Sequence, residues 1–243
     1  EILSTIHEHY NYPVDVEFTI NFSQDGDFLI NLVQCRPLQA KGSGAQDVSI
    51  PTVSDDTTFF HLKRGTMGGP VSMPIDLVAI VDGKGYYDLP YNSKYSIPRE
   101  IEMINKYARE YKKSLMLIGP GRWGTSSPDL GVPVRFAQIS NVSALCETSF
   151  ENDLMPELSF GSHFFQDLVE SNIFYAAIFD RNFIQGEDSV YRPEIFDRTE
   201  NIYTKIPSVT QNYTDVIRVY DTSTLKLYLV ANSASNEAIC YIK

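Results

Sequence analysis

Cysteine, long apolar runs and excess positive charge are all scarce in this 243-residue sequence. Its three cysteines, Cys35, Cys146 and Cys240, are far apart and odd in number, so they suggest neither a disulfide framework nor C-x-x-C metal spacing. Each lies in an apolar stretch, which predicts buried free thiols in a reducing, cytoplasmic compartment. No apolar run approaches the roughly 20 residues that a membrane-spanning helix needs, so we expect no membrane partner.

The charge balance is acidic, with a formal net charge of −11. A surface of that sign repels phosphate backbones, so we expect no nucleic-acid partner. A few local arginine and lysine side chains can still hold a small phosphorylated ligand. Hydrophobic residues form 43% and aromatic residues 12% of the chain, which is enough to build a sizeable core.

The start of the chain predicts a helix followed by a β-hairpin. Apolar residues at helical spacing mark a helix over 1–9. Two alternating runs, Val14–Phe22 and Phe28–Cys35, then flank an Asp25-Gly26 turn signal. Because an isolated hairpin is only marginally stable, residues 1–38 are expected to need a partner surface.

A change in composition separates this hairpin from the rest of the chain. Residues 39–56 are rich in Gly, Ser, Pro and Asp, as linkers are, and we place a domain boundary there. Residues 57–243 alternate predicted strands and helices, which favours a mixed α/β (α+β) domain with a β-rich tail. The predicted strands are 77–81, 115–118, 142–147 and 173–179, the predicted helices are 98–113 and 163–171, and a meander of three strands is predicted at 216–220, 225–231 and 238–242.

Charged and amide side chains lie on both strands of the predicted hairpin. Alternate residues of a strand share a face, so Asp15 and Glu17 lie together on one strand, and Gln34 and Arg36 on the other. If the strands pair, these side chains can meet on one surface. A carboxylate there can hold the magnesium of a nucleotide, and a guanidinium can hold its phosphates. The alternative is a cross-strand salt bridge on a solvated face.

These elements, D-V-E-F-T at 15–19 and L-V-Q-C-R-P at 32–37, resemble the end of the ATP-grasp domain of phosphoenolpyruvate synthases and pyruvate phosphate dikinases. The resemblance implies that Glu17 binds metal–ATP, that Gln34 contacts the nucleotide and that Arg36 contacts its phosphates. It implies ATP and Mg²⁺ as cofactors and assigns residues 1–38 to the C-terminal end of such a domain. The chain is then expected to be an inactive fragment of a longer enzyme.

A glycine-rich loop follows the predicted strand at 115–118. A strand that runs into such a loop can direct backbone N–H groups, a guanidinium and hydroxyls toward an anion. The candidates for this anion site are Gly119, Gly121, Arg122, Gly124 and Thr125. No helix pattern follows directly, so the loop lacks the context of a Walker or Rossmann phosphate loop. The alternative is a rigid turn, with glycines at positive φ and Trp123 packed as a hydrophobic plug.

A histidine, His163, begins the predicted helix at 163–171, after the potential capping residue Ser162. The N-terminus of a helix stabilises a phosphate placed there. In the swivel domain of the same family, the catalytic phosphohistidine opens a helix that ends before a buried strand, so the resemblance implies that role for His163. Phe164 and Phe165 replace small residues of the family motif. The alternative is a histidine near a helix cap, packed beside aromatic residues.

By resemblance, the intact protein is expected to be an ATP-dependent phosphotransferase. Phosphate would pass from Mg-ATP to a histidine and then to pyruvate or another small acceptor, with residues 57–243 similar to a phosphohistidine swivel domain. The competing hypothesis is a non-catalytic ligand-binding or regulatory module, with 119–127 as its ligand loop. Exposure of His163 favours the first hypothesis, and its burial by the two phenylalanines favours the second. The oligomeric state stays open, a homo-oligomer included.

Overall fold

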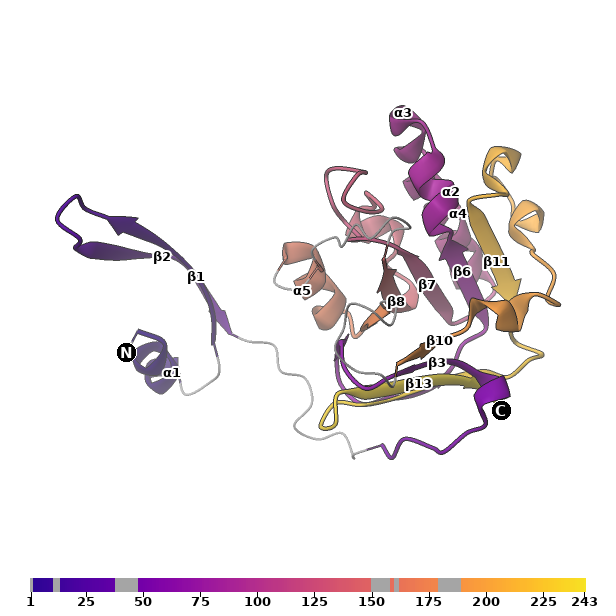
Figure 1. Cartoon of the computed structure of the whole chain (residues 1–243), viewed down its shortest axis with the longest axis horizontal. Helices are drawn as coiled ribbons and strands as arrows, with labels where there is room; N and C mark the ends of the chain where they lie inside the picture. The colour runs from indigo at the N-terminus through magenta and orange to yellow at the C-terminus, as the bar shows by residue number, and fades with distance from the viewer. Residues whose placement is uncertain (1, 11–13, 38–47, 150–157, 160–161, 179–188) are drawn as a thin grey trace. The chain divides into compact units, whose positions relative to one another are not determined.

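The computed structural model describes residues 2–10, 14–37, 48–149, 158–159, 162–178 and 189–243. The chain divides into two compact units, Glu1–Ser43 and Gly44–Lys243, which are drawn in Figure 1. Secondary structure in the described ranges is mixed, with several β-sheets and few helices, which confirms the predicted mixed α/β class.

The first unit is a helix and a two-stranded antiparallel ribbon. Its elements are α1 (Ile2–Tyr10), β1 (Val14–Phe22) and β2 (Phe28–Pro37), close to the predicted ranges. Backbone hydrogen bonds close the turn between the strands, with Ser23 N donating to Asp27 O at 2.8 Å. Gly26 has a φ angle of 87°, a conformation that glycine adopts without the penalty other residues have.

A six-stranded sheet forms the centre of the second unit, in the order β11-β6-β7-β8-β9-β4. The four middle strands are parallel, and the two edge strands are antiparallel to their neighbours. Each parallel strand is buried on both faces, which explains the short, almost continuous apolar runs in the sequence. The strands are β4 (Thr66–Met67), β6 (Leu77–Val81), β7 (Leu115–Pro120), β8 (Val142–Thr148), β9 (Phe174–Ile178) and β11 (Ile217–Asp221).

A second, antiparallel sheet of five strands has the order β10-β3-β13-β12-β5. It combines strands from the beginning and the end of the unit, because β13 pairs with both β3 and β12. Its strands are β3 (Thr58–Leu62), β5 (Val71–Pro74), β10 (Val190–Tyr191), β12 (Leu227–Asn232) and β13 (Glu237–Ile242).

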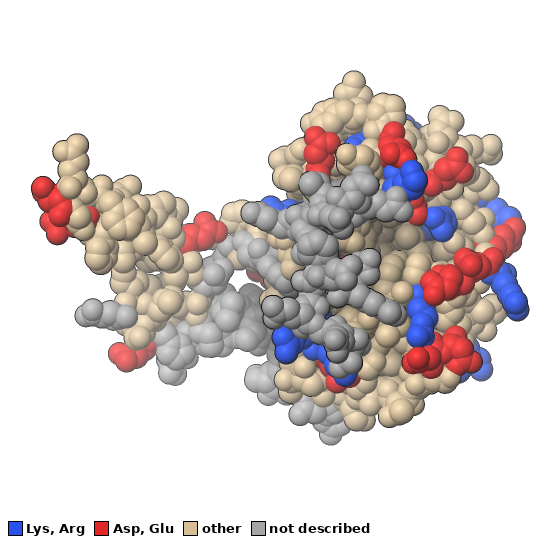
Figure 2. Space-filling model, viewed as in Figure 1, with Lys and Arg blue, Asp and Glu red and all other residues tan. Residues whose placement is uncertain are grey.

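α-Helices lie between β6 and β7 and between β8 and β9, whereas β7 and β8 are joined by a loop with one 3₁₀ turn. The helices are α2 (Gly83–Asp88), α3 (Tyr91–Lys94), α4 (Ile97–Glu110) and α5 (His163–Glu170), and short 3₁₀ turns lie at Asp55–Thr57, Phe136–Gln138, Pro193–Phe196, Tyr203–Lys205 and Gln211–Tyr213. None of the helices in the described ranges is long and apolar enough to cross a membrane. On the face of this unit shown in Figure 2, lysine and arginine side chains lie among carboxylates rather than in one block.

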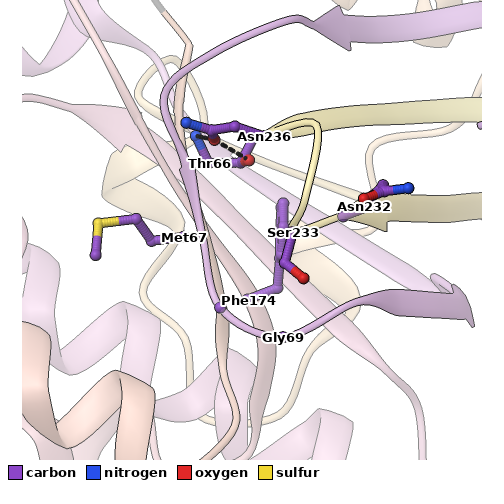
Figure 3. Close-up of a pocket in the computed structure, with 9 residues that line it drawn as sticks. Thr66, Met67, Gly69, Phe174, Asn232, Ser233 and Asn236 are labelled. Atoms are coloured by element: carbon purple, nitrogen blue, oxygen red, sulfur yellow. Dashed lines mark hydrogen bonds between the residues drawn. The ribbon is translucent and has the colours of Figure 1, made fainter. Parts of the chain in front are cut away.

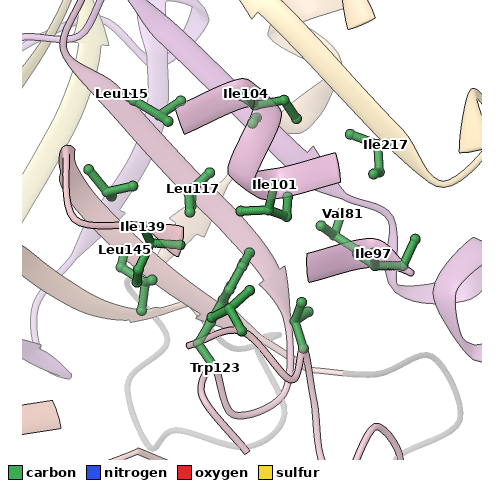
Figure 4. Packing of buried hydrophobic residues seen from close by; sticks show 14 of the residues in the cluster. Val81, Ile97, Ile101, Ile104, Leu115, Leu117, Trp123, Ile139, Leu145 and Ile217 are labelled. Atoms are coloured by element: carbon green, nitrogen blue, oxygen red, sulfur yellow. The ribbon is translucent and has the colours of Figure 1, made fainter. Parts of the chain in front are cut away.

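Two apolar layers hold the second unit together. Leu77, Ala79 and Val81 of β6 pack into a core with the helices, and Figure 4 shows this core around Ile101, Leu117 and Trp123. Val78 and Ile80 point the other way and pack against the five-stranded sheet. The unit therefore has three layers, with helices on one face of the parallel sheet and the antiparallel sheet on the other. Complete burial of a leucine or isoleucine side chain contributes about 1.5–3 kcal/mol.

The predicted C-terminal meander is wrong. β11 pairs with β6 in the parallel sheet, whereas β12 and β13 form a hairpin in the other sheet. The chain crosses between the sheets at buried Thr222, whose N–H donates to Asp76 O at 2.9 Å and whose hydroxyl donates to Ile75 O at 2.5 Å. The sequence shows three β runs in succession, but each of them also pairs with a strand more than 100 residues earlier in the chain.

Candidate functional site

The polar face of the hairpin depends on a β-bulge. Phe18 lies opposite Leu32, and the register then shifts so that Glu17 lies opposite Gln34. Val33 is the extra residue. Had the first register continued, Gln34 would lie opposite Val16, on the apolar face. The bulge therefore brings Glu17 and Gln34 to the same face.

The same shift sets the position of Arg36. Its Cα lies opposite that of Asp15, two residues along the same face from the Glu17–Gln34 pair. The side chains of Asp15 and Arg36 lie outside the described part of the structure, while those of Glu17 and Gln34 are partly exposed. The backbone register therefore places the three predicted nucleotide-binding positions, 17, 34 and 36, on one face of one ribbon.

In the second unit, the other two sequence candidates come to the same edge of the parallel sheet. The loop at 119–127 is at the end of β7, and α5 follows β8 in the chain, with Phe164 at its start packed against Gly124 of the loop. The loop and the start of α5 therefore adjoin the carboxyl ends of parallel strands. Ligands of open α/β sheets commonly bind at this edge. Sequence reasoning treated the glycine-rich loop and His163 as separate features, and the fold brings them together.

A buried glutamate, Glu147 near the end of β8, connects the two. Its side chain accepts hydrogen bonds from Trp123 N at 3.0 Å, Ser159 N at 3.1 Å and Tyr175 Oη at 2.5 Å, and also from the Ser159 hydroxyl. The residue is 1% exposed. Burial raises the pKa of Glu147 above its usual value, and these hydrogen bonds oppose that rise. Glu147 thus joins the loop, the segment before α5 and strand β9.

The glycine-rich loop is a rigid turn. Gly121 and Gly124 have φ angles of 67° and 73°, and Trp123 is fully buried, with its indole N–H donating to Cys146 O at 3.2 Å. The backbone N–H groups of residues 121, 122 and 124 donate to carbonyl groups of Thr148, Leu130 and Val132. With the Trp123 N–H bound to Glu147, the N–H groups of residues 121–124 are all bound within the protein. This geometry corresponds to the rigid-turn alternative.

Gly119 and Thr125, two further candidates of this loop, also have contacts within the protein. A Cβ at Gly119 would lie 2.7 Å from the Trp123 ring, so only glycine allows the tryptophan to pack there. The Thr125 hydroxyl accepts a hydrogen bond from Ser127 N at 3.2 Å. The side chain of Arg122 is partly buried.

The loop packs directly on the helix that begins with His163. A Cβ at Gly124 would lie 2.4 Å from the Phe164 ring, so the two segments are in close contact. Ser162 caps α5 as predicted, with its hydroxyl accepting from Phe165 N at 3.2 Å. His163 is exposed, whereas Phe165 is buried. The phenylalanines therefore pack inward without covering the histidine.

Sequence reasoning missed Glu147 and its partners. Glu147 lies near the end of an apolar strand, where a carboxylate normally faces solvent. No local pattern distinguishes it from such an exposed residue. Its hydrogen-bond donors are 12 to 28 residues distant in the chain. Only the packing of β8 between β7 and β9 shows that this carboxylate is enclosed.

A small pocket lies elsewhere in the second unit, between β4 and the β12–β13 turn (Figure 3). It has a volume of about 240 Å³ and none of the sequence candidates lines it. Asn236 Oδ1 on its wall accepts from Thr66 N at 3.2 Å and from the Thr66 hydroxyl at 2.7 Å. Asn232, on another wall, donates to Val48 O at 2.9 Å. These polar contacts tie the turn to its surroundings.

Comparison with known proteins relates the start of the chain to one family. Residues 1–56 match the family described as pyruvate phosphate dikinase, AMP/ATP-binding domain. This segment is related to the phosphoenolpyruvate synthase and pyruvate phosphate dikinase family. The match contains the whole hairpin, with the bulge and the Glu17–Gln34 pair, and it supports nucleotide binding. No curated protein and no solved structure matches the chain.

Proposed function

We propose that the chain is part of a cytoplasmic, ATP-dependent phosphotransferase in which the hairpin supplies contacts to Mg-ATP. The observation that carries the proposal is the bulged register, which puts positions 17, 34 and 36 on one face of a segment related to AMP/ATP-binding domains. A face with a carboxylate, an amide and a guanidinium suits a magnesium-bound triphosphate. By itself the ribbon is one wall of such a site.

In this proposal each hairpin residue has a separate role. Glu17 is the metal ligand, which fits Mg²⁺ because this ion usually takes one or two protein carboxylates and fills its other positions with phosphate oxygens and water. The metal neutralises charge on the phosphates. Gln34 orients the nucleotide, and Arg36 neutralises the phosphate that is transferred.

The phosphoryl group then passes to His163. A bond forms between an imidazole nitrogen and phosphorus while the bond from phosphorus to the nucleotide oxygen breaks, and an oxygen of pyruvate or another small acceptor later takes the group from the histidine. Support comes from the exposure of His163 at the start of α5. A helix N-terminus stabilises the phosphate that the histidine would carry.

Mass spectrometry of the phosphorylated protein tests this role. The full-length protein that contains this chain is incubated with Mg-ATP and searched for an acid-labile phosphate on histidine. We expect a label on His163 that is absent from His163→Ala and present in His9→Ala, a control at an exposed helical histidine. If neither the wild-type protein nor His9→Ala carries a phosphohistidine, the carrier role of His163 is contradicted.

A second experiment tests the hairpin independently. Arg36→Ala in the full-length protein should abolish ATP turnover while the melting temperature is unchanged, because the guanidinium acts on phosphate rather than on a core. Arg109→Ala, an exposed position on α4, is the matched control and should keep full turnover. Normal turnover in Arg36→Ala would show that the hairpin is structural only.

A further inference from the structure

A lysine outside the proposed phosphotransfer site is almost completely buried. Lys94 lies at the end of α3, and its side chain is 8% exposed. Within the described part of the chain its only charged partner is Asp129, with 3.7 Å between Nζ and Oδ1, which is too long for a hydrogen bond. A buried ammonium is unfavourable unless its charge and its N–H donors are satisfied.

Two tyrosine rings contact the Lys94 ammonium. Its Nζ atom lies 5.4 Å from the ring centroids of both Tyr86 and Tyr87. Such cation–π contacts stabilise the charge but leave the N–H donors available. Tyr86 is fixed in place, because it is fully buried and its hydroxyl donates to Gly131 O at 2.7 Å. The lysine is therefore held by a rigid wall on one side.

Exposed tyrosines contact this cation or lie beside Lys94 in the sequence of α3. Tyr87, Tyr91 and Tyr95 are each 48–49% exposed. The rings of Tyr91 and Tyr95 meet edge to face, with centroids 5.7 Å apart, and their hydroxyls are 3.3 Å apart. Burial raises the pKa of Tyr86, and the nearby charge of Asp129 adds to the rise. Tyr87 contacts the ammonium directly, and Tyr91 and Tyr95 flank Lys94 along the short α3 segment. This segment therefore combines a positive charge with exposed apolar area.

The location fits a ligand site. α2 follows β6 directly, and Asp129 lies in the loop after β7, so the cluster stands at the carboxyl ends of two adjacent parallel strands. A crevice at this edge is the usual place for a ligand in an α/β sheet. Asp129 is 63% exposed and can turn toward solvent when another anion approaches Lys94.

We propose that Lys94 and the tyrosines at 87, 91 and 95 bind a small molecule that carries a phosphate or carboxylate group on a flat, apolar body. The ammonium takes the anionic group in place of Asp129, and the exposed rings stack on the body of the ligand. This site is independent of the nucleotide and histidine roles proposed above, since it shares none of their residues.

Phenyl phosphate is a suitable probe because it combines the two features. It is titrated into the 243-residue chain by calorimetry and by the fluorescence of Trp123, the single tryptophan, which lies in the same loop as Asp129. We expect one saturable site with a fluorescence change. Benzoate should bind there as well if carboxylates are accepted, and inorganic phosphate should bind at least tenfold more weakly because it has no ring to stack.

Substitutions distinguish the contribution of the lysine charge to the affinity from that of the tyrosine rings. Lys94→Met should weaken phenyl phosphate at least tenfold, while Lys106→Met, at an exposed lysine paired with Glu102, should leave the affinity unchanged. Tyr91→Ala should weaken phenyl phosphate several-fold and leave inorganic phosphate as it was. Asp129→Asn should strengthen binding several-fold, because it removes the competing carboxylate while Lys94 itself is kept.

The opposite results would overturn the proposal. If the lysine serves only to pack the tyrosines, the wild-type chain will show no saturable phenyl phosphate binding, and Lys94→Met will lower the melting temperature. Should Lys94→Met fail to fold, Asp129→Asn still decides, because unchanged or weaker binding in that variant contradicts a site in which Asp129 competes with the ligand.

Discussion

Phenylalanine has opposite environments in the two units of this chain. In the hairpin, Phe22 and Phe28 are 74% and 64% exposed, although both lie in paired strands and Phe22 alternates with polar residues. In the second unit, Phe59 and Phe60 of β3 are both fully buried. The difference shows that alternation is enough to form a strand pair, whereas a core needs a second layer. The second unit has three layers, and the first has one ribbon and one short helix.

Carboxylates differ between the two units in the same way. Glu17 lies on a ribbon face with partly exposed neighbours, where it can meet a ligand. Glu147 is enclosed, and its two oxygens accept hydrogen bonds from the loop, the segment before α5 and β9. Its acceptors are satisfied by the protein itself. The exposure of each carboxylate therefore distinguishes Glu17, a candidate metal ligand, from Glu147, which holds segments of the fold together.

The strongest test of the difference between the two units is to replace phenylalanine by alanine in each of them. Phe59→Ala should lower the free energy of unfolding of the second unit by about 3–5 kcal/mol, because it leaves a cavity between the sheets. Phe22→Ala should change it by less than about 0.5 kcal/mol, as surface substitutions do. Urea denaturation followed by Trp123 fluorescence measures both. A large loss in Phe22→Ala would mean that the hairpin face is covered in solution.

Glu147→Gln should have the next largest effect. An amide nitrogen replaces one oxygen that accepts two hydrogen bonds, and we expect a loss of about 2–3 kcal/mol in unfolding free energy. Asp167→Asn, at an exposed position on α5, is the control and should be nearly neutral. Equal stability of Glu147→Gln and wild type would show that the buried carboxylate does not hold the loop against α5.

The pH dependence of that loss follows from the raised pKa of Glu147. A carboxyl group whose pKa is higher in the folded state contributes stability that is complete below its unfolded pKa and is lost as pH rises through its folded pKa. The advantage of wild type over Glu147→Gln should therefore shrink from pH 4.5 upward. Urea denaturation of both proteins over this range tests the sign, and an advantage that grows with pH would contradict it.

The smallest expected effect is that of removing the β-bulge, which should leave ATP turnover unchanged. Deleting Val33 removes the extra residue, so that Gln34 follows Leu32 directly and still lies opposite Glu17 in a regular ladder. The full-length protein should keep its ATP turnover, because the predicted nucleotide face is unchanged. As a contrast, inserting one alanine after Gln34 moves position 36 to the other face and should abolish turnover. Loss of turnover on deletion of Val33 would show that the twist of the bulge is itself required.

Local patterns explain which parts of the fold the sequence predicts. The strands β6, β7 and β8 are short runs of apolar residues because both of their faces are buried, and each run has clear turn signals beside it. The hairpin and the Ser162 cap are also local. The five-stranded sheet could not be predicted because β13 pairs with β3, almost 180 residues earlier. The sequence near either strand gives no sign of that pairing.

The candidate sites follow the same division. Glu17, Gln34 and Arg36 stand out because strand alternation and the hairpin turn are short-range features, although the bulge that puts them on one face is not visible as a pattern. Glu147 and Lys94 look like ordinary polar residues in the sequence. Only the packing of segments from other parts of the chain shows that both are buried, and burial is what makes them chemically informative.

The central position of β13 has a consequence for how the chain folds during synthesis. β13 leaves the ribosome after every other described strand, yet it lies between β3 and β12 and completes their hydrogen bonding. Until then β3 has an open edge and Phe59 has no finished layer to pack against. The nascent second unit is thus expected to depend on chaperones or rapid completion, because unpaired strand edges in incomplete sheets readily aggregate.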